Sequence, residues 1–122
     1  TIVLNVAGAF HSSLMSSAAI KLEKLLAGIS FKSPAFPVIA NVTGQPHGSG
    51  DDIRRLMVKQ VTSSVQWLKT IQEFQKIGVK DYIECGPGKI LGGLITRIAP
   101  AAATYNLQDL DSVKKTAAAI QV

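Results

Sequence analysis

Residues 81–98 read DYIECGPGKILGGLITRI, and this stretch contains the three parts of one folding unit. Residues 81–85 are typical of a strand, Gly86-Pro87-Gly88 is typical of a tight turn, and residues 89–98 are typical of a helix. The helical part is apolar nearly all the way round, which predicts deep burial. A strand followed by a helix is the unit from which α/β folds are built.

The same alternation continues on both sides of this stretch. Apolar periodicity predicts, besides the elements above, strands at 2–6 and 37–42, a short extended piece at 104–106, and helices at about 14–26, 51–60, 65–77 and 111–120. Residues 45–50 are predicted to be a loop because of their Gly, Pro and Ser content. Strands alternating with helices predict a parallel sheet with helices packed on it.

Capping residues mark the ends of the predicted helices. Ser12 or Ser13 can cap the first helix, and Ser64 can cap the third. Gly28 and Gly78 stand where left-handed C-terminal residues belong. The positions expected to face the core are Leu14, Ala18, Leu22, Leu25 and Leu26 in the first helix, Ile53, Leu56 and Met57 in the second, and Trp67, Leu68, Ile71 and Phe74 in the third.

Composition excludes several classes of protein. The chain has 122 residues, 47% of them apolar, which is enough for one packed core and argues against disorder. No run approaches the roughly 20 apolar residues of a membrane span, and residues 1–6 lack the basic start of a secretion signal. A single cysteine and two histidines exclude an internal disulfide and a CxxC-type zinc site. We therefore expect a cytoplasmic or organellar protein without membrane contact or bound metal.

The charge pattern gives little support to nucleic-acid binding. Thirteen basic and eight acidic residues leave a net charge of +5, but the only adjacent basic pairs are Arg54-Arg55 and Lys114-Lys115. No recognition motif and no mixture of aromatic and basic residues accompanies them. We expect no nucleic-acid partner, whereas an acidic protein or a phosphorylated cofactor fits a basic face equally well.

The turn at 86–88 invites comparison with phosphate-binding loops, because backbone amides at a helix start attract anions. A GxGxxG fingerprint would need glycine where the chain has Leu91, and a Walker loop would need Ser or Thr where it has Ile90. The simpler interpretation is that the glycines allow close packing and that Glu84 is a hydrogen-bonded structural carboxylate. Cys85 is interpreted as a small apolar side chain at the end of a buried strand.

Several polar side chains remain open to two interpretations. His11 follows a predicted strand, where α/β folds place reactive groups, but a histidine beside a phenylalanine can equally be structural. His47 is expected to be a solvated turn residue. Asn41, Gln60 and Gln66 could be site residues or hydrogen-bonded buried amides.

Four blocks taken together resemble one known family. They are residues 8–12 (GAFHS), 37–44 (PVIANVTG), 59–67 (KQVTSSVQW) and 84–89 (ECGPGK), and they occur in the order and at the spacing of the carboxyl-terminal part of malonyl-CoA:acyl carrier protein transacylases. The resemblance covers nearly the whole chain. Two departures, Ser64 in place of proline and Cys85 in place of an aliphatic residue, touch no chemical step.

The resemblance implies an activity and a set of site residues. Malonyl passes from coenzyme A to the phosphopantetheine thiol of acyl carrier protein through an ester on a serine, with the coenzyme A thioester as substrate and no bound cofactor. His11 corresponds to the base that takes the serine proton, and Gln60 to the residue whose main-chain carbonyl orients this imidazole. Phe10 corresponds to the aromatic position that favours malonyl over methylmalonyl. The setting is the biosynthesis of fatty acids or, through related domains, of polyketides.

The resemblance also implies a fold that this chain only partly contains. Residues 1–10 would end a small ferredoxin-like subdomain, and residues 11–122 would form the carboxyl-terminal part of an α/β-hydrolase-like subdomain. The family's GHSxG serine, its malonyl-binding arginine and its oxyanion-hole glutamine lie upstream of the GAFH block, and no Gly-x-Ser-x-Gly occurs here. We therefore expect this chain to act with an amino-terminal half, to be inactive alone, and to expose apolar surface without that half.

One alternative belongs to a different functional class. A degenerate half-domain could bind acyl carrier protein without catalysis, through a basic face to which Lys59, Lys69, Lys76 and Lys89 would contribute. Binding of that kind weakens with salt, whereas chemistry on a serine leaves a covalent intermediate. Nucleotide binding at the Gly-Pro-Gly turn is a distant third interpretation.

Overall fold

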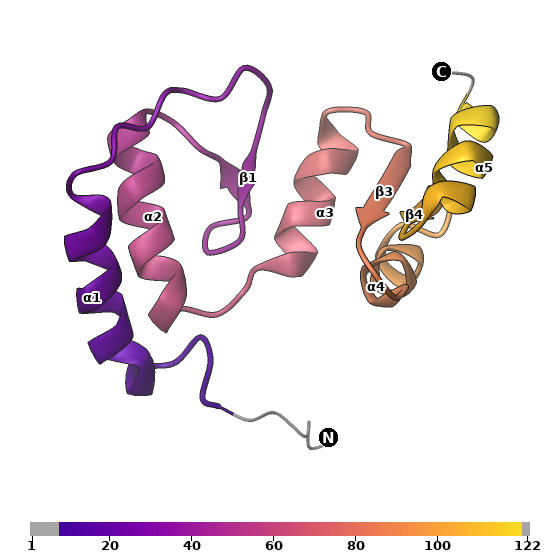
Figure 1. Ribbon diagram of the computed structural model, residues 1–122. Coiled ribbons are helices and arrows are strands. Elements are labelled where there is room, and N and C mark those ends of the chain that lie inside the picture. Colours follow the sequence, from indigo (N-terminus) through magenta and orange to yellow (C-terminus); the bar gives the residue numbers. More distant parts are fainter. Residues whose placement is uncertain (1–7, 121–122) are drawn as a thin grey trace. The chain divides into compact units, whose positions relative to one another are not determined.

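The computed structural model describes residues 8–120. The chain divides into two compact units, Thr1–Thr70 and Ile71–Val122 (Figure 1). The strand predicted at residues 2–6, and most of the subdomain end predicted at residues 1–10, lie outside the described residues.

The first unit is built on two helices packed against each other. A short 3-10 turn, η1 (Ser13–Met15), leads into α1 (Ser16–Leu26), and α1 lies beside α2 (Gly50–Thr62) (Figure 1). The predicted cap is confirmed at Ser12, whose hydroxyl oxygen accepts the Leu14 N–H at 3.3 Å. Helix α2 begins in the same way, because the Ser49 hydroxyl oxygen accepts the Asp52 N–H at 3.3 Å.

The end of α1 differs from the prediction. Gly28 does not have a positive φ, so the expected left-handed cap is wrong. The guanidinium of Arg54 on α2 instead donates to the Leu26 carbonyl at 3.1 Å and to the Ile29 carbonyl at 2.8 Å. A side chain from the neighbouring helix therefore binds carbonyl groups at the end of α1 and just beyond it.

The predicted apolar stripe of the first unit is only partly buried. Ala19, Leu26 and Leu56 are buried, but Leu14 is 79% exposed and Leu25 is 72% exposed. Met57, which we also expected to face inward, is exposed. Helical spacing is therefore confirmed for Leu26 and Leu56, and is wrong for Leu14, Leu25 and Met57 as far as burial among the described residues is concerned.

A small antiparallel hairpin connects the two helices of this unit. The strand predicted at 37–42 is reduced to β1 (Ile39–Ala40), which pairs with β2 (Gln45–Pro46). The prediction of a loop at 45–50 is therefore wrong for its first two residues. The backbone N–H groups of Thr43 and Gly44 both donate to the Ala40 carbonyl, and this turn reverses the chain.

The second unit contains the parallel sheet that the sequence predicts. Strand β3 (Asp81–Cys85) pairs in parallel with β4 (Ala103–Leu107), and α4 (Ile90–Ile98) connects them. Helix α5 (Leu110–Ile120) follows β4. The boundary between the two units lies within helix α3 (Trp67–Lys76), after Thr70. Buried apolar residues of this unit are Ile71, Tyr82, Ile95 and Ala99.

Turn residues of the second unit behave largely as predicted. Gly78 follows α3 with a φ of 83°, and in the Gly-Pro-Gly turn Gly86 and Gly88 have φ values of 132° and 96°. Such values favour glycine because they bring a Cβ atom into conflict with the backbone. The prediction that Ser64 caps α3 is wrong, because α3 begins three residues later, at Trp67.

Helix α4 is not deeply buried, which corrects the prediction from its composition. Ile95 is 5% exposed, but Ile90 is 76% exposed and Leu91 and Leu94 are also exposed. Leu68 on α3 and the Cys85 thiol at the end of β3 are exposed as well. Among the described residues β3 has β4 as its single strand neighbour, and α4 contacts both strands while these apolar side chains stay exposed.

Candidate active site around His11

His11 and Gln60 are 49 residues apart in the sequence and in contact in the fold. The imidazole Nδ1 of His11 lies 3.0 Å from the main-chain oxygen of Gln60. A carbonyl oxygen only accepts hydrogen bonds, so this contact is satisfied when Nδ1 carries the proton. The remaining ring nitrogen, Nε2, then has a free lone pair on an exposed side chain. The arrangement provides an oriented base.

The backbone at His11 has an unusual conformation. Its φ is 59°, and His11 is the only non-glycine residue among residues 8–120 with a positive φ. The turn that holds it is closed by Ser12, whose hydroxyl donates to the Ala9 carbonyl at 2.7 Å. A left-handed L residue costs about 1–2 kcal/mol, and such strain concentrates at functional sites.

The main-chain carbonyl of Gln60 can accept a hydrogen bond from His11 because of its position in α2. It lies in the last turn of the helix, where carbonyl groups have no partner four residues further along. The Ser63 N–H approaches this oxygen only at 3.4 Å. The negative end of the helix dipole also favours a donor or a cation at this point.

The side chain of Gln60 takes part in the same cluster. Its Nε2 donates to the Ser63 carbonyl at 2.9 Å and lies 3.3 Å from Nδ1 of His11. Its Oε1 is buried and has no hydrogen-bond partner among the described residues. Gln60 is therefore a half-buried amide that also contacts His11, so its geometry fits both alternatives that the sequence left open.

Phe10 precedes His11 and is 64% exposed, so its ring is not part of the core formed by the described residues. The other histidine also differs from expectation. His47 is half-buried, its Nδ1 has no hydrogen-bond partner within residues 8–120, and it lines a cavity of about 320 Å³ together with Gln60 and Asn41. It is not the solvated turn residue that the sequence predicts.

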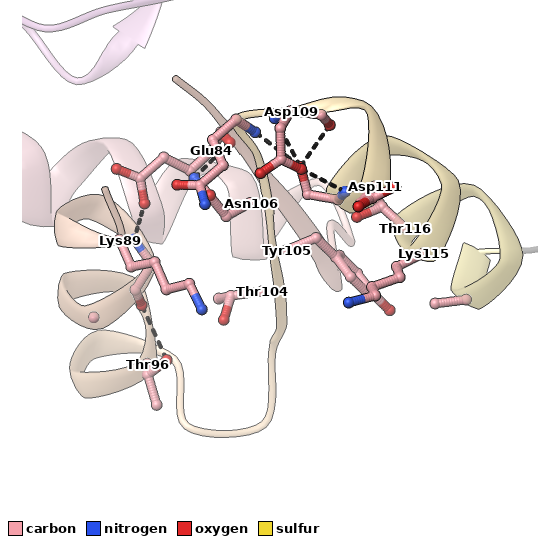
Figure 2. A pocket seen from close by; sticks show the side chains of 15 residues that line it. Glu84, Lys89, Thr96, Thr104, Tyr105, Asn106, Asp109, Asp111, Lys115 and Thr116 are labelled. Carbon is pink, nitrogen blue, oxygen red and sulfur yellow. Dashed lines mark hydrogen bonds between the residues drawn. The ribbon is translucent and has the colours of Figure 1, made fainter. Parts of the chain in front are cut away.

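The Gly-Pro-Gly turn is organised by two side chains (Figure 2). The Glu84 carboxylate accepts the Leu91 N–H at 3.1 Å and the Gly92 N–H at 2.9 Å, as the interpretation of Glu84 as a structural carboxylate requires. The Asn106 amide nitrogen lies 2.7–3.2 Å from the carbonyl oxygens of Glu84, Gly86 and Gly88. Two amides at the start of α4 that could bind a phosphate are thus already occupied by a negative group, which argues against nucleotide binding here.

A larger cavity of about 880 Å³ lies between α4, β4 and α5 of the second unit (Figure 2). Some of its polar residues, at the start of α5, are hydrogen-bonded to one another. The Ser112 N–H donates to Asp109 at 2.8 Å, and this backbone hydrogen bond is the main cause of a lowered Asp109 pKa. Burial, followed by the nearby Asp81 carboxylate, raises the pKa of Tyr105. This cavity has the hydrogen bonding of a helix start rather than of a reaction centre.

Residues 8–120 contain no group of three or more His, Cys, Asp or Glu side chains placed to hold a metal ion. No helix within this range combines the length and the hydropathy that crossing a bilayer requires.

Sequence reasoning missed Asn106 and the contact between the Gln60 side chain and His11. The blocks pointed to the Gln60 carbonyl, but only the fold shows that the amide beside it contacts the same imidazole nitrogen. Asn106 lies in a strand 18 to 22 residues from the carbonyl groups that it contacts. No local pattern in the sequence predicts such a contact.

Comparison with known proteins supplies the class and the family. No protein-family model matches the chain. It is 42% identical to the polyketide biosynthesis protein ThaF of Burkholderia thailandensis over 84% of this chain and 9% of that protein. It is 37% identical to the malonyl CoA-acyl carrier protein transacylase of Synechocystis sp. over 90% of this chain and 38% of that protein.

Solved structures agree with the sequence matches. The malonyl CoA-acyl carrier protein transacylase of Clostridium perfringens superposes with a TM-score of 0.91 at 35% identity, covering 98% of this chain and 38% of that chain. A type II polyketide acyl carrier protein in complex with its malonyl-transacylase also matches, with a TM-score of 0.86 at 36% identity, over 92% of this chain and 36% of that chain.

The class that these matches define is an acyl-transferring enzyme with an α/β fold. The particular family is consistent across curated and structural neighbours, which name malonyl CoA-acyl carrier protein transacylase over most of this chain. The resemblance predicted from the four sequence blocks is confirmed. The chain spans at most 38% of the length of the four proteins compared.

Proposed function

We propose that this chain supplies the base of a malonyl-CoA:acyl carrier protein transacylase whose nucleophilic serine lies on a preceding segment. The observation that carries this proposal is the 3.0 Å contact between Nδ1 of His11 and the main-chain oxygen of Gln60. A serine hydroxyl is a weak nucleophile until a positioned base removes its proton. An imidazole fixed through Nδ1 presents Nε2 for that purpose.

The proposed reaction has two matched halves. The serine oxygen attacks the thioester carbonyl of malonyl-CoA while His11 Nε2 accepts the hydroxyl proton, and the proton then passes to the departing coenzyme A sulfur. In the second half, His11 takes the proton of the phosphopantetheine thiol, which attacks the serine ester, and returns it to the serine oxygen. In both halves Nδ1–H donates to the Gln60 carbonyl, because this oxygen can accept from the neutral and from the cationic ring.

The acyl donor in this proposal is a coenzyme A thioester, and no bound cofactor takes part. Phe10 adjoins the base and is exposed, so its ring is free to border the malonyl group and to disfavour a methyl substituent on it. Acyl carrier protein is the proposed acceptor. In support, one structural neighbour is a transacylase in complex with an acyl carrier protein.

The proposal includes the rest of the fold. Residues 11–122 would complete an α/β-hydrolase-like subdomain, and residues 1–10 would end a ferredoxin-like one. The preceding segment would provide the serine, and without it the chain would be inactive. Exposed apolar side chains on α1 and α4 support a missing packing partner of this kind.

The test is intact-mass spectrometry after incubation with malonyl-CoA. Two samples are compared: the 122-residue chain alone, and the same chain fused to the preceding segment of the Synechocystis relative. We expect a malonyl adduct on the fusion and none on the chain alone. A fusion that folds and binds acyl carrier protein in a salt-sensitive manner, yet never acquires the adduct, would favour the non-catalytic half-domain.

A further inference from the structure

Gln60 presents two opposite hydrogen-bonding groups to one atom of His11. The main-chain oxygen, an acceptor, lies 3.0 Å from Nδ1, and the side-chain Nε2, a donor, lies 3.3 Å from it. These two contacts cannot be satisfied together in a neutral ring. The acceptor requires a proton on Nδ1, whereas the donor requires a lone pair there.

The orientation of the Gln60 amide follows from its other neighbour. The nitrogen faces the Ser63 carbonyl at 2.9 Å, and a flipped amide would set two oxygens against each other. The amide group has two N–H bonds. One donates to the Ser63 carbonyl, so the other can donate to Nδ1 of His11. Oε1 is turned away into buried surroundings, without a hydrogen-bond partner among residues 8–120. The donor next to His11 is thus fixed by the fold.

We propose that the side-chain amide of Gln60 is a positioning residue that controls the tautomer of His11, in competition with its own main-chain carbonyl. With the proton on Nδ1, the ring bonds to the carbonyl and Nε2 is free to act as a base. With the proton on Nε2, the ring accepts from the amide and cannot act as a base. This inference rests on the proposed function for its catalytic meaning, but the tautomer balance itself is a property of the described contacts.

The functional consequence is that a fraction of the molecules holds His11 in the Nε2–H tautomer, which is inactive as the base. The shorter contact favours the base-competent tautomer, and the amide holds a fraction of the molecules in the other one. Once Nε2 has taken a proton, both ring nitrogens are donors, and the amide no longer has an acceptor. Removal of the amide should therefore increase the base-competent fraction, whereas loss of the carbonyl contact would decrease it.

The test is ¹⁵N NMR of the imidazole rings in the fused protein, since the Nδ1 and Nε2 shifts report the tautomer directly. A His11→Asn variant of the fusion identifies the His11 signals. We expect both tautomers of His11 in the wild type. In Gln60→Met, which keeps the length and the main-chain carbonyl, the Nδ1–H to Nε2–H ratio should rise about fivefold, as expected for the loss of one neutral hydrogen bond.

Two further variants keep the result decisive. Gln60→Glu replaces the donor by an acceptor and should shift His11 almost entirely to the Nδ1–H tautomer, whereas Gln72→Met on α3 should leave the ratio unchanged. A single tautomer in the wild type would overturn the inference, as would an unchanged ratio in Gln60→Met or Gln60→Glu. Malonyl loading of the fused protein is measured separately. A tautomer shift without loading contradicts the proposed function alone, and loading without a shift contradicts this inference alone.

Discussion

His11 combines a strained backbone with an exposed, oriented side chain. Its φ of 59° is shared by no other non-glycine residue in the described part of the chain. Asparagine tolerates the same left-handed conformation better than most residues, so His11→Asn should leave the free energy of unfolding unchanged or slightly raised. A histidine kept for packing would show the opposite, because its replacement would cost stability. Urea titration of the wild type and the variant separates the two interpretations.

Phe10 yields a prediction about selectivity at the same scale. Phe10→Ala, made in the fused enzyme, should raise the ratio of methylmalonyl to malonyl loading by roughly 10- to 200-fold, since one methyl group in a pocket is worth about 1–3 kcal/mol. Competition between the two coenzyme A thioesters, read by mass spectrometry, measures the ratio. The matched control is Phe36→Ala, which removes another exposed ring far along the chain from His11. Equal ratios in Phe10→Ala and the wild type would contradict the role.

At the scale of elements, the start of α2 depends on a close approach of two backbones. A Cβ atom on Gly50 would collide with the Phe31 carbonyl oxygen and lie 2.9 Å from its carbon, whereas a Cβ on Gly28 would meet nothing within 4 Å. Gly50→Ala should lower the free energy of unfolding by about 1–3 kcal/mol, because the backbone must move. Gly28→Ala should be neutral or stabilising by up to about 1 kcal/mol. Urea titrations compare the pair, and equal midpoints would refute the close approach.

The start of α5 provides a dependence on pH. The Ser112 backbone N–H, followed by its hydroxyl, holds the Asp109 pKa below the usual 3.8. A carboxylate with a lowered pKa in the folded state stabilises the fold above the unfolded-state pKa, and this contribution is lost as pH falls through the folded-state value. Unfolding midpoints measured from pH 5 down to about pH 2 should fall less in Asp109→Asn than in the wild type. Parallel curves would contradict the contribution of Asp109.

Local patterns predicted some elements well and others poorly. Strand β4 and helix α5 lie within one or two residues of their predicted bounds, because periodicity and local capping define both. The two-residue strands β1 and β2 have no periodicity to detect and depend on the turn between them. Burial of α4 was overestimated, because an apolar helix shows what its surface could pack against but not whether that partner is in the same chain.

The candidate site was predictable only in part. The resemblance of four blocks identified His11 and Gln60 as partners, and the structure brings the two together. The competing amide, the exposed Phe10 and the half-buried His47 depend on the geometry of contacts between distant segments. Such contacts leave no mark in a single sequence.

At the scale of the whole molecule, the exposed apolar side chains require an explanation. Leu14 and Leu25, which helical spacing places among core positions, are exposed. Ile90 and Leu94, in a helix whose composition predicts deep burial, are exposed as well. The 122-residue chain alone should therefore bind the dye ANS and associate in light scattering, and fusion to the preceding segment should reduce both signals. A monomeric chain that binds no dye would contradict a missing packing partner.

The most direct test of the account is the single-turnover rate of serine malonylation in the fused protein, wild type against His11→Asn. We predict a loss of about 10²- to 10⁴-fold in the variant, the usual contribution of a general base, with an unchanged free energy of unfolding. A variant that loads malonyl at the wild-type rate would contradict the assignment of His11 as the base.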